Sequence, residues 1–262
     1  MNTPNIQSVS ISMIVVNYHT PDLVLHMMST LYGSSLEMVI VDNSPTLELE
    51  KGLSRYPKAI YVKNERNLGF AGGVNAGLKV ANGEWIYLLN TDAQTTPIDV
   101  LTLVHAAQEH HALVAAPQLV RDDGSIERNV GYFSGSISHV LDWLLARPRF
   151  ADPHPITIPT NVDVATGGAL LVHKSVFDQI GFFDEKHFFM YFEDIDFSLR
   201  LNSNRISILY VPAIKVRHSG GGSSDQDPTI KTRNYQTSLY AYVLKNRGPF
   251  VAWLNTKLKL FT

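Results

Sequence analysis

The sequence predicts an α/β fold in which a mostly parallel sheet carries helices on both faces. Short apolar runs alternate with segments of helical periodicity through the first half of the chain, which is typical of parallel strands joined by crossover helices. Polar residues follow several of these runs, as they do at the ligand-binding edge of an open sheet. The composition, with 45% hydrophobic and 18% charged residues, favours a folded chain with a sizeable core.

Length, charge and cysteine content exclude several classes of protein. The 262 residues form either one large domain or two small ones. A net charge of −2 argues against a dedicated nucleic-acid binder. The absence of cysteine excludes disulfides, thiolate nucleophiles and cysteine-ligated zinc. No basic leader precedes the apolar run Ile11–Val16, which is too short to span a membrane. We therefore expect a cytoplasmic protein with no nucleic-acid partner.

The elements of the first half follow from the alternation. A proline at the first helical position starts two predicted helices, over residues 21–31 and 97–110, and Gly33 ends the first of them. The Gly-rich segment 67–77 opens a further helix directly after a strand. Five apolar runs predict buried strands, at residues 10–16, 38–41, 59–62, 85–89 and 113–116.

After Pro117 the alternation changes. A hairpin is expected over residues 118–128, and the Pro-rich segment 147–159 is either a loop near a cleft or a junction between subdomains. Strands are predicted over 163–173, where two glycines interrupt the pattern, and over 206–211. Helices are predicted over residues 193–202, 229–245 and 249–261.

Polar residues occur at the carboxyl ends of four predicted strands. Each alone is a common turn former or helix cap, but together they indicate a ligand-binding edge. These residues are Asn17, Asp42, Asn43, Asn67, Asn90 and Asp92. The glycines of segment 67–77 either let a phosphate approach a helix start or pack that helix closely. The segment matches neither a P-loop nor a Gly-x-Gly-x-x-Gly dinucleotide fingerprint.

Asp92 and His218 are candidate ligands of a divalent cation. A carboxylate at a strand end can hold Mg²⁺ or Mn²⁺ while phosphate oxygens complete the coordination. Asn90, two positions earlier, supplies only a neutral amide, and Asp92 has the alternative role of a turn cap. His218 stands beside Arg217 in a segment that we expect to be a flexible Gly-rich loop. It either ligates metal, contacts phosphate, or is a structural or surface histidine.

Glu193, Asp194 and Asp196 form an acidic cluster directly after the aromatic segment 188–192. Carboxylates beside apolar surface are unfavourable to bury without a partner. Desolvation and mutual repulsion raise their pKa values, which suits a general base. The alternative is that they only complement the dipole at a helix start, which leaves the aromatic residues unexplained. Together with Asp92, the cluster indicates transfer chemistry on a charged substrate that carries a diphosphate.

In this order the motifs resemble the family 2 inverting glycosyltransferases with the GT-A fold, especially their rhamnosyltransferase-like branch. The resemblance implies a Rossmann-like, mostly parallel sheet with a smaller acceptor-side portion, and it covers about residues 10–225. The motifs are Val16-Asn17-Tyr18, Val41-Asp42-Asn43-Ser44, the segment 67–77, Leu89-Asn90-Thr91-Asp92, Gly167-Gly168-Ala169, Gly181-Phe182-Phe183-Asp184-Glu185 and Phe189-Met190-Tyr191-Phe192-Glu193-Asp194.

The resemblance implies a role for each matching residue. Asp194 would be the general base for the acceptor hydroxyl, and Glu193 would orient groups beside it. Asp92 and His218 would bind Mg²⁺ or Mn²⁺ on the donor diphosphate, although Asn90 replaces a carboxylate that is common in the wider family. The nucleotide-sugar would be bound by Asn17, Asp42, Asn67, Gly69, Gly72, Asn75, Asn90, Thr91, Asp92, Gly167 and Gly168.

By the same resemblance, the donor is a nucleotide-diphospho-sugar, and dTDP-L-rhamnose is the first expectation. The acceptor would be a glycan or a polyprenyl-diphosphate-linked sugar of a growing cell-surface polysaccharide such as O-antigen. One alternative is a UDP-sugar donor, either UDP-galactose or UDP-GlcNAc. The other is a non-catalytic subunit that binds sugar nucleotides as a scaffold in a polysaccharide assembly complex.

The chain is expected to divide at about residue 225. Residues 1–225 would form the glycosyltransferase domain, with a nucleotide-sugar half to about residue 117 and an acceptor half beyond it. Residues 226–262 would form a helical segment that ends in tryptophan, leucine, phenylalanine and lysine side chains. Such a helix either lies in a membrane interface on the inner face of the cytoplasmic membrane, packs within the protein, or forms a homo-oligomer contact.

Overall fold

The computed structural model describes residues 9–133, 148–150, 156–220 and 228–258. Part of the predicted Pro-rich segment 147–159 and the end of the predicted helix 249–261 lie outside these ranges. Among the described residues, no helix combines the length and the apolar character needed to cross a membrane.

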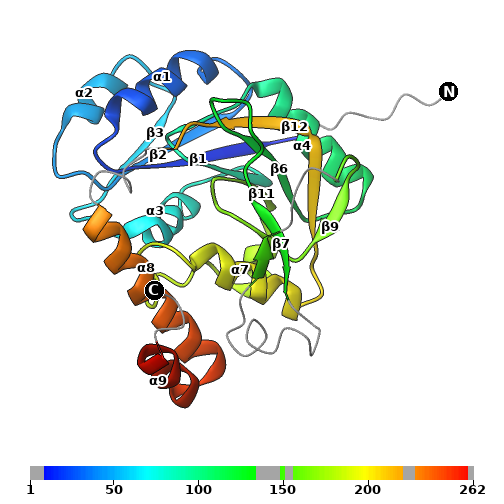
Figure 1. The fold of residues 1–262 in the computed structure, drawn as a ribbon. Helices are drawn as coiled ribbons and strands as arrows, with labels where there is room; N and C mark the ends of the chain where they lie inside the picture. Colours follow the sequence, from blue (N-terminus) through cyan, green and yellow to red (C-terminus); the bar gives the residue numbers. More distant parts are fainter. Residues whose placement is uncertain (1–8, 134–147, 151–155, 221–227, 259–262) are drawn as a thin grey trace.

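A large, mostly parallel sheet forms the centre of the molecule (Figure 1). Its main strands are β1 (Ile11–Asn17), β2 (Glu37–Asp42), β3 (Ile60–Lys63), β4 (Trp85–Leu89), β5 (Ala93–Gln94), β6 (Val114–Val120), β11 (Ala169–His173) and β12 (Ile208–His218). They lie in the order β3-β2-β1-β4-β11-β6-β12-β5. Strand β11 is antiparallel to both β4 and β6, and the edge strand β5 is antiparallel to β12. The other neighbours in this order pair in parallel. A further short strand, β9 (Thr160–Val162), pairs antiparallel with β12.

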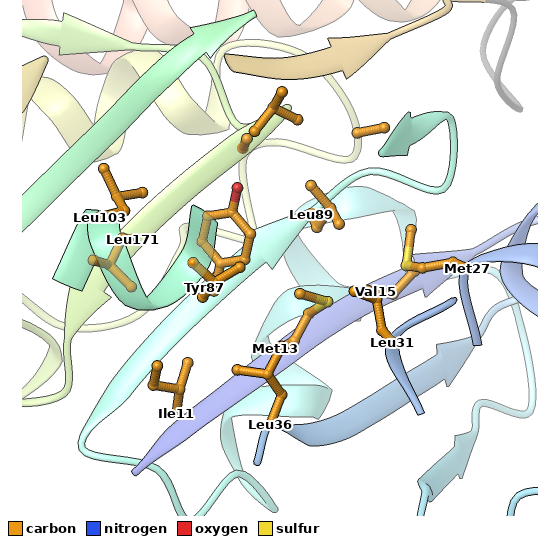
Figure 2. Close-up of a cluster of buried hydrophobic side chains, with 14 of the residues drawn as sticks. Ile11, Met13, Val15, Met27, Leu31, Leu36, Tyr87, Leu89, Leu103 and Leu171 are labelled. Carbon is orange, nitrogen blue, oxygen red and sulfur yellow. The ribbon is translucent and has the colours of Figure 1, made fainter. Parts of the chain in front are cut away.

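Alternating side chains of the strands bury two hydrophobic clusters, one on each face of the sheet. On β1, Met13 and Val15 join the first cluster, whereas Ile14 joins the second. Figure 2 shows Met13 and Val15 with Tyr87 and Leu89 of β4 in the first cluster. That cluster is covered by α1 (Pro21–Leu31), α2 (Glu48–Leu53) and α4 (Pro97–Glu109), and the second by α3 (Gly69–Leu78), α6 (Ser175–Ile180) and α7 (Glu193–Ser203). The predicted α/β fold with helices on both faces is therefore confirmed.

Helix α3 contains the Gly-rich segment and lies unusually close to the sheet. A Cβ atom on Gly73 would approach Val16 Cγ1 to 2.5 Å, and one on Gly77 would approach Ile14 Cγ2 to 2.6 Å. These two glycines therefore allow close packing of α3 on β1, which is one of the two alternatives that the sequence left open.

A small sheet and a pair of helices complete the described fold. The small sheet has the order β10-β7-β8, with β7 (Val130–Phe133), β8 (Pro148–Phe150) and β10 (Val164–Ala165). Helices α8 (Pro228–Arg247) and α9 (Pro249–Leu258) form the C-terminal helical pair, which extends away from the large sheet (Figure 1) and packs against α7. Lys245 of α8 ties this pair to the sheet-bearing part, because its Nζ lies 2.7 Å from carboxylate oxygens of both Asp184 and Asp196.

Two strands are longer than predicted. Strand β6 continues past Pro117 to Val120. A proline is tolerated at position 117 because β11, the neighbouring strand, pairs only with Val114 and Ala115 of β6. Strand β12 continues to His218 after an irregularity between Val211 and Lys215. The expectation that His218 lies in a flexible loop was therefore wrong: it is the last residue of β12.

Several short elements were not predicted. Helices α2 and α6 have six residues each, and β5 has two, so none is long enough to display a periodicity. The predicted hairpin over 118–128 is reduced to a turn closed by a single bridge between Val120 and Ile126. The predicted strand 163–173 is split at its two glycines, so that β10 and β11 belong to different sheets.

Replacing Lys245 with alanine should lower the free energy of unfolding by roughly 1–3 kcal/mol, because a buried carboxylate would lose one of its two cationic partners. Asp196 is 1% exposed and would retain only Arg200. Urea denaturation measures the loss, and the exposed Lys58→Ala substitution is the control, expected to change stability by less than about 0.5 kcal/mol.

The same substitution has a predicted pH dependence. Burial raises the pKa of Asp184, but hydrogen bonds from Lys245 and His187 more than offset this and lower it to about 2. A lowered pKa means that the interaction stabilises the fold above the ordinary pKa of 3.8 and is lost as the pH falls toward 2. The difference between wild type and Lys245→Ala should therefore shrink below about pH 4. A difference that stays constant down to pH 2 would contradict this assignment.

Candidate active site

A cleft of about 280 Å³ opens where the carboxyl ends of β4 and β12 meet the turn 166–168 and the start of α7. It lies beyond the strand ends of the large sheet, where open α/β sheets bind their ligands. Eight residues that the sequence singled out line it, namely Asn90, Thr91, Asp92, Gly167, Gly168, Glu193, Asp194 and His218.

Asp194 is held at the wall of the cleft by two backbone N–H groups. The Gly167 N–H donates to Asp194 Oδ2 with a nitrogen–oxygen distance of 3.0 Å. The Ile195 N–H donates to Asp194 Oδ1 with a nitrogen–oxygen distance of 2.8 Å. Burial raises the pKa of Asp194, while the N–H donors act in the opposite direction by favouring the carboxylate. A Cβ atom on Gly167 would approach Phe70 to 3.1 Å, so the absence of a side chain lets this N–H reach the carboxylate closely.

Glu193, the neighbouring residue, has a different environment. Its side chain is buried and its Oε2 has no hydrogen-bond partner. Burial, and then the charge of Asp194, raises the pKa of Glu193 well above its ordinary value. The pKa values of both adjacent carboxyl groups are therefore raised, and the N–H groups of Gly167 and Ile195 favour the ionised form of Asp194. Asp194 is the member that the backbone stabilises as a carboxylate.

The backbone before this pair is in an unusual conformation. Tyr191 and Phe192 both have left-handed φ angles, of 70° and 67°, which bulky residues rarely adopt. The Phe192 side chain is buried against the C-terminal helical pair, and the Met190 carbonyl accepts a hydrogen bond from Ser238 Oγ of α8. Helix α8 therefore stabilises the turn that delivers Glu193 and Asp194 to the cleft.

Asp92, His218 and Glu127 form a second polar group in the cleft. Asp92 Oδ1 lies 3.4 Å from His218 Nε2, and Glu127 Oε2 lies 2.8 Å from His218 Nδ1. Interaction with Asp92, and then with Glu127, raises the pKa of His218 to about 10. Two carboxylates around one imidazole therefore favour a positive charge at this point, whether a proton or a metal ion supplies it.

These residues fit a divalent cation with two protein ligands. A metal-ligating imidazole usually presents one nitrogen to the ion while a carboxylate holds the other, and Glu127 holds His218 Nδ1 in this way. The buried Nε2 has no hydrogen-bond partner and faces Asp92. Within the described part of the chain, no three His, Asp or Glu side chains are arranged as a complete metal centre, so further ligands would come from a bound molecule.

Asn17 and Asp42 lie outside the lining of the cleft, and both side chains are fully buried in a hydrogen-bond network. Asp42 accepts hydrogen bonds from Asn17, Tyr61 and Lys63 at 2.8–2.9 Å. Burial raises the pKa of Asp42, but these donors outweigh it and hold the pKa below its ordinary value. The Thr20 hydroxyl lies 2.9 Å from Asn17 Oδ1 and 3.1 Å from the Thr91 hydroxyl, so the network borders the strand end at Asp92. Its predicted contact with a nucleotide stays a prediction.

The predicted residues of segment 67–77 position neighbouring backbone. Asn67 Oδ1 accepts from the Gly69 N–H at the start of α3, and Gly69 lies against the Phe189 carbonyl. Asn75 is buried and bonds both the N–H and the carbonyl of Phe183. A Cβ atom on Gly72 would approach Leu68 Cβ to 2.7 Å. None of these four residues lines the cleft, and their predicted contact with the donor is untested.

Sequence reasoning missed Glu127 and Thr166, and it gave Tyr191 no role in the cleft although that residue belongs to a quoted motif. No motif marks Glu127, because it comes from the turn after β6 and reaches His218 only through the fold. Buried side-chain atoms without a hydrogen-bond partner gather here: Thr166 Oγ1, Tyr191 OH, Glu193 Oε2 and His218 Nε2. Such atoms are rare in folded proteins, so their concentration in one cleft indicates a site for a polar ligand.

Comparison with known proteins places this geometry in a family. The model of glycosyl transferase family 2 matches residues 12–181. The low-salt glycan biosynthesis hexosyltransferase Agl10 of Haloferax volcanii is 28% identical over 246 residues, which are 92% of this chain and 75% of that protein. N-acetylglucosaminyl-diphospho-decaprenol L-rhamnosyltransferase of Mycobacterium tuberculosis is 28% identical over 231 residues, 79% of this chain and 74% of that protein. Rhamnosyltransferase WbbL of Escherichia coli is 25% identical over 246 residues, 89% of this chain and 92% of that protein.

Solved structures of glycosyltransferases share the fold. The crystal structure of GalNAc-T7 with UDP, GalNAc and Mn²⁺ superposes with a TM-score of 0.68 at 16% identity, covering 90% of this chain and 48% of that one. Mannosyltransferase PcManGT of Pyrobaculum calidifontis, in complex with GDP-Man and Mn²⁺, gives a TM-score of 0.61 at 13% identity. The superposition covers 95% of this chain and 70% of that one. The fold is therefore GT-A, and because the family model spans more than half of the residues, this chain belongs to glycosyl transferase family 2.

Proposed function

We propose that this protein is an inverting hexosyltransferase that moves a sugar from a nucleotide-diphospho-sugar to a hydroxyl group of a glycan acceptor. The observation that carries the proposal is that one cleft contains both a backbone-stabilised carboxylate, Asp194, and the Asp92–His218 pair. An inverting transfer needs a base on one side of the anomeric carbon and charge stabilisation of the leaving group on the other.

Asp194 is the base in this reaction. Its carboxylate accepts the proton of the acceptor hydroxyl while the hydroxyl oxygen forms a bond to the anomeric carbon. The bond between that carbon and the diphosphate oxygen breaks, and its electron pair leaves with the nucleoside diphosphate. The raised pKa of Asp194 strengthens it as a base, and its two N–H donors keep it oriented. Burial of Glu193 raises its pKa and so favours the neutral form, which limits the negative charge beside the base.

Asp92 and His218 would hold the divalent cation, Mg²⁺ or Mn²⁺. A bound cation would neutralise charge on the donor diphosphate as it departs. Glu127 fixes the orientation of His218 through Nδ1, and the Thr91 hydroxyl is fixed by Thr20. The two structural neighbours contain Mn²⁺, which supports a cation here without distinguishing between the two metals.

L-rhamnose from dTDP-L-rhamnose is the donor that we infer, and a lipid-linked cell-surface glycan is the acceptor class. Support comes from the relatives of Mycobacterium tuberculosis and Escherichia coli, whose names state rhamnosyl transfer. The first of these names also specifies an N-acetylglucosaminyl-diphospho-decaprenol acceptor. A UDP-sugar is the second candidate donor, because GalNAc-T7 carries UDP. The intact Asp194 and Asp92 favour an active enzyme over a scaffold subunit.

Replacing Asp194 with asparagine should lower kcat by about 10²–10⁴-fold, the usual contribution of a positioned base. The amide cannot accept the proton, so turnover should fall. Because the amide keeps the size of the carboxylate, donor affinity should change little. Product formation by chromatography and donor affinity by calorimetry separate the two quantities. Asp178→Asn, at an exposed position of α6, is the matched control. Turnover close to wild type in Asp194→Asn would reject the assignment.

A thermal-shift panel tests the donor and the metal together. dTDP-L-rhamnose should raise the Tm more than UDP-galactose, UDP-GlcNAc or GDP-mannose, and Mn²⁺ or Mg²⁺ should enlarge the increase. In Asp92→Ala the increase from donor alone should remain, while the additional increase with metal should disappear. An unchanged response of Asp92→Ala to Mn²⁺ would remove Asp92 from the metal site. A larger shift with a UDP-sugar would replace the donor and leave the family assignment intact.

Glu193→Gln should change how stability depends on pH. The raised pKa of Glu193 means that the folded state binds its proton more tightly than the unfolded chain does. Wild-type stability from this group is therefore complete below the ordinary pKa of 4.5 and is lost as the pH rises toward the raised value. Glutamine does not titrate, so the Tm of Glu193→Gln relative to wild type should increase with pH.

The comparison is cleanest in the Asp194→Asn background, because that variant removes the coupled neighbouring charge. Glu109→Gln, on the exposed surface of α4, controls for the general effect of removing a carboxylate. Parallel curves for Glu193→Gln and its parent across the pH range would show that Glu193 is not held protonated.

A further inference from the structure

The C-terminal helical pair differs in charge from the rest of the chain. Residues 228–258 contain five lysines and arginines and no aspartate or glutamate, although the whole chain has a net charge of −2. The five basic residues are Lys231, Arg233, Lys245, Arg247 and Lys257, and Lys245 bonds Asp184 and Asp196. Such an asymmetry in sign is typical of a segment that meets an anionic surface.

Helix α9 exposes its largest side chains and buries its smallest. Ala252 is fully buried, whereas Phe250 is 70% exposed and Trp253 is 54% exposed. Their rings stack with centroids 6.2 Å apart. Phe250, Trp253 and Lys257 are spaced three and four residues apart, so they share one face of the helix, and Lys257 is exposed as well. A helix that only packed against its own protein would present the opposite arrangement.

We propose that this face of α9 docks the enzyme on an anionic phospholipid surface. Aromatic rings with basic neighbours are the side chains that occupy the interface between headgroups and acyl chains, and juxtaposed lysines and arginines are attracted to the negative lipid phosphates. A second copy of this chain is a poorer occupant, because pairing two acid-free helical pairs would bring like charges together. The helices cover the surface without crossing the bilayer.

Docking would also fix the cleft relative to the membrane. Helix α8 contacts the turn that precedes Glu193 through Ser238 and the Met190 carbonyl, and its Tyr235 and Tyr242 rings lie 5.2 and 5.4 Å from the Phe192 ring. A membrane-bound helical pair would therefore present the base at a set position above a lipid-linked acceptor. This consequence rests on the proposed function, whereas the docking itself does not.

Co-sedimentation of the full-length protein with vesicles tests the inference without donor or acceptor. We expect binding to vesicles of phosphatidylcholine with about 30% phosphatidylglycerol, much weaker binding to phosphatidylcholine alone, and a decrease as salt is raised. Phe250→Ser with Trp253→Ser should weaken binding by about tenfold or more, and Lys257→Glu by a smaller factor. Ile98→Ser and Lys58→Glu, which alter an equally exposed apolar residue and an exposed lysine elsewhere, are the matched controls.

Two further measurements separate the possible outcomes. The Tm and the donor-induced thermal shift of the double variant should equal those of wild type, which excludes unfolding as the cause of lost binding. Sedimentation velocity should give the same mass for both proteins. Unchanged vesicle binding by the double variant would overturn the proposal. If, in addition, the double variant sedimented with a lower mass than wild type, the face would be assigned to a contact between copies of this chain. Failure of sugar transfer with intact vesicle binding would reject the proposed function alone.

Discussion

Two hydrogen bonds donated by backbone N–H groups connect the end of β4 to Asp194, the proposed base. The Asn90 N–H donates to the Gly168 carbonyl, and the Gly167 N–H donates to Asp194 Oδ2. Each donor nitrogen lies 3.0 Å from its acceptor oxygen. The antiparallel strand β11 makes this possible, because its insertion between β4 and β6 brings Gly168 beside the end of β4. Residues more than a hundred positions apart in the sequence are thereby held in register, and the separation of the two functional groups is set by main-chain atoms.

The price of this arrangement is local instability, which other parts of the molecule offset. Glu193 is buried with an unpartnered oxygen, and the two residues before it have left-handed backbone. Each such feature is unfavourable by about 1–3 kcal/mol. Phe192 packs into the cluster formed with Tyr242 and Leu239 of α8, and Lys245 neutralises buried Asp196 on α7. The C-terminal helical pair therefore contributes to the site although it supplies no residue to the cleft lining.

Sequence patterns predicted the parts of this fold that follow from local chemistry. The strands that carry Asn17, Asp42 and Asp92 are continuous apolar runs, and the acidic start of α7 follows an aromatic segment, so both were visible without a structure. The end of β12 was not predicted, because the predicted strand stops at Val211, where the pairing with β6 becomes irregular before it resumes at Lys215. Helix α6 and the small sheet depend on contacts distant in sequence and leave no periodicity to recognise. The role of Glu127 was not predicted for the same reason, because its contact with His218 joins residues that are distant in the sequence.

Glu127 changes how the neutral Asn90 should be understood. The sequence showed one carboxylate at the strand end where the wider family has two, which weakened the case for a metal. In three dimensions a second carboxylate approaches from the turn after β6 and bonds the far nitrogen of His218. A carboxylate in that position makes the imidazole a stronger electron donor at Nε2, the atom that faces Asp92. The charge absent from position 90 is therefore present in the site, but it acts through His218, and pairing of β12 with β5 at Ala93 holds that histidine beside Asp92.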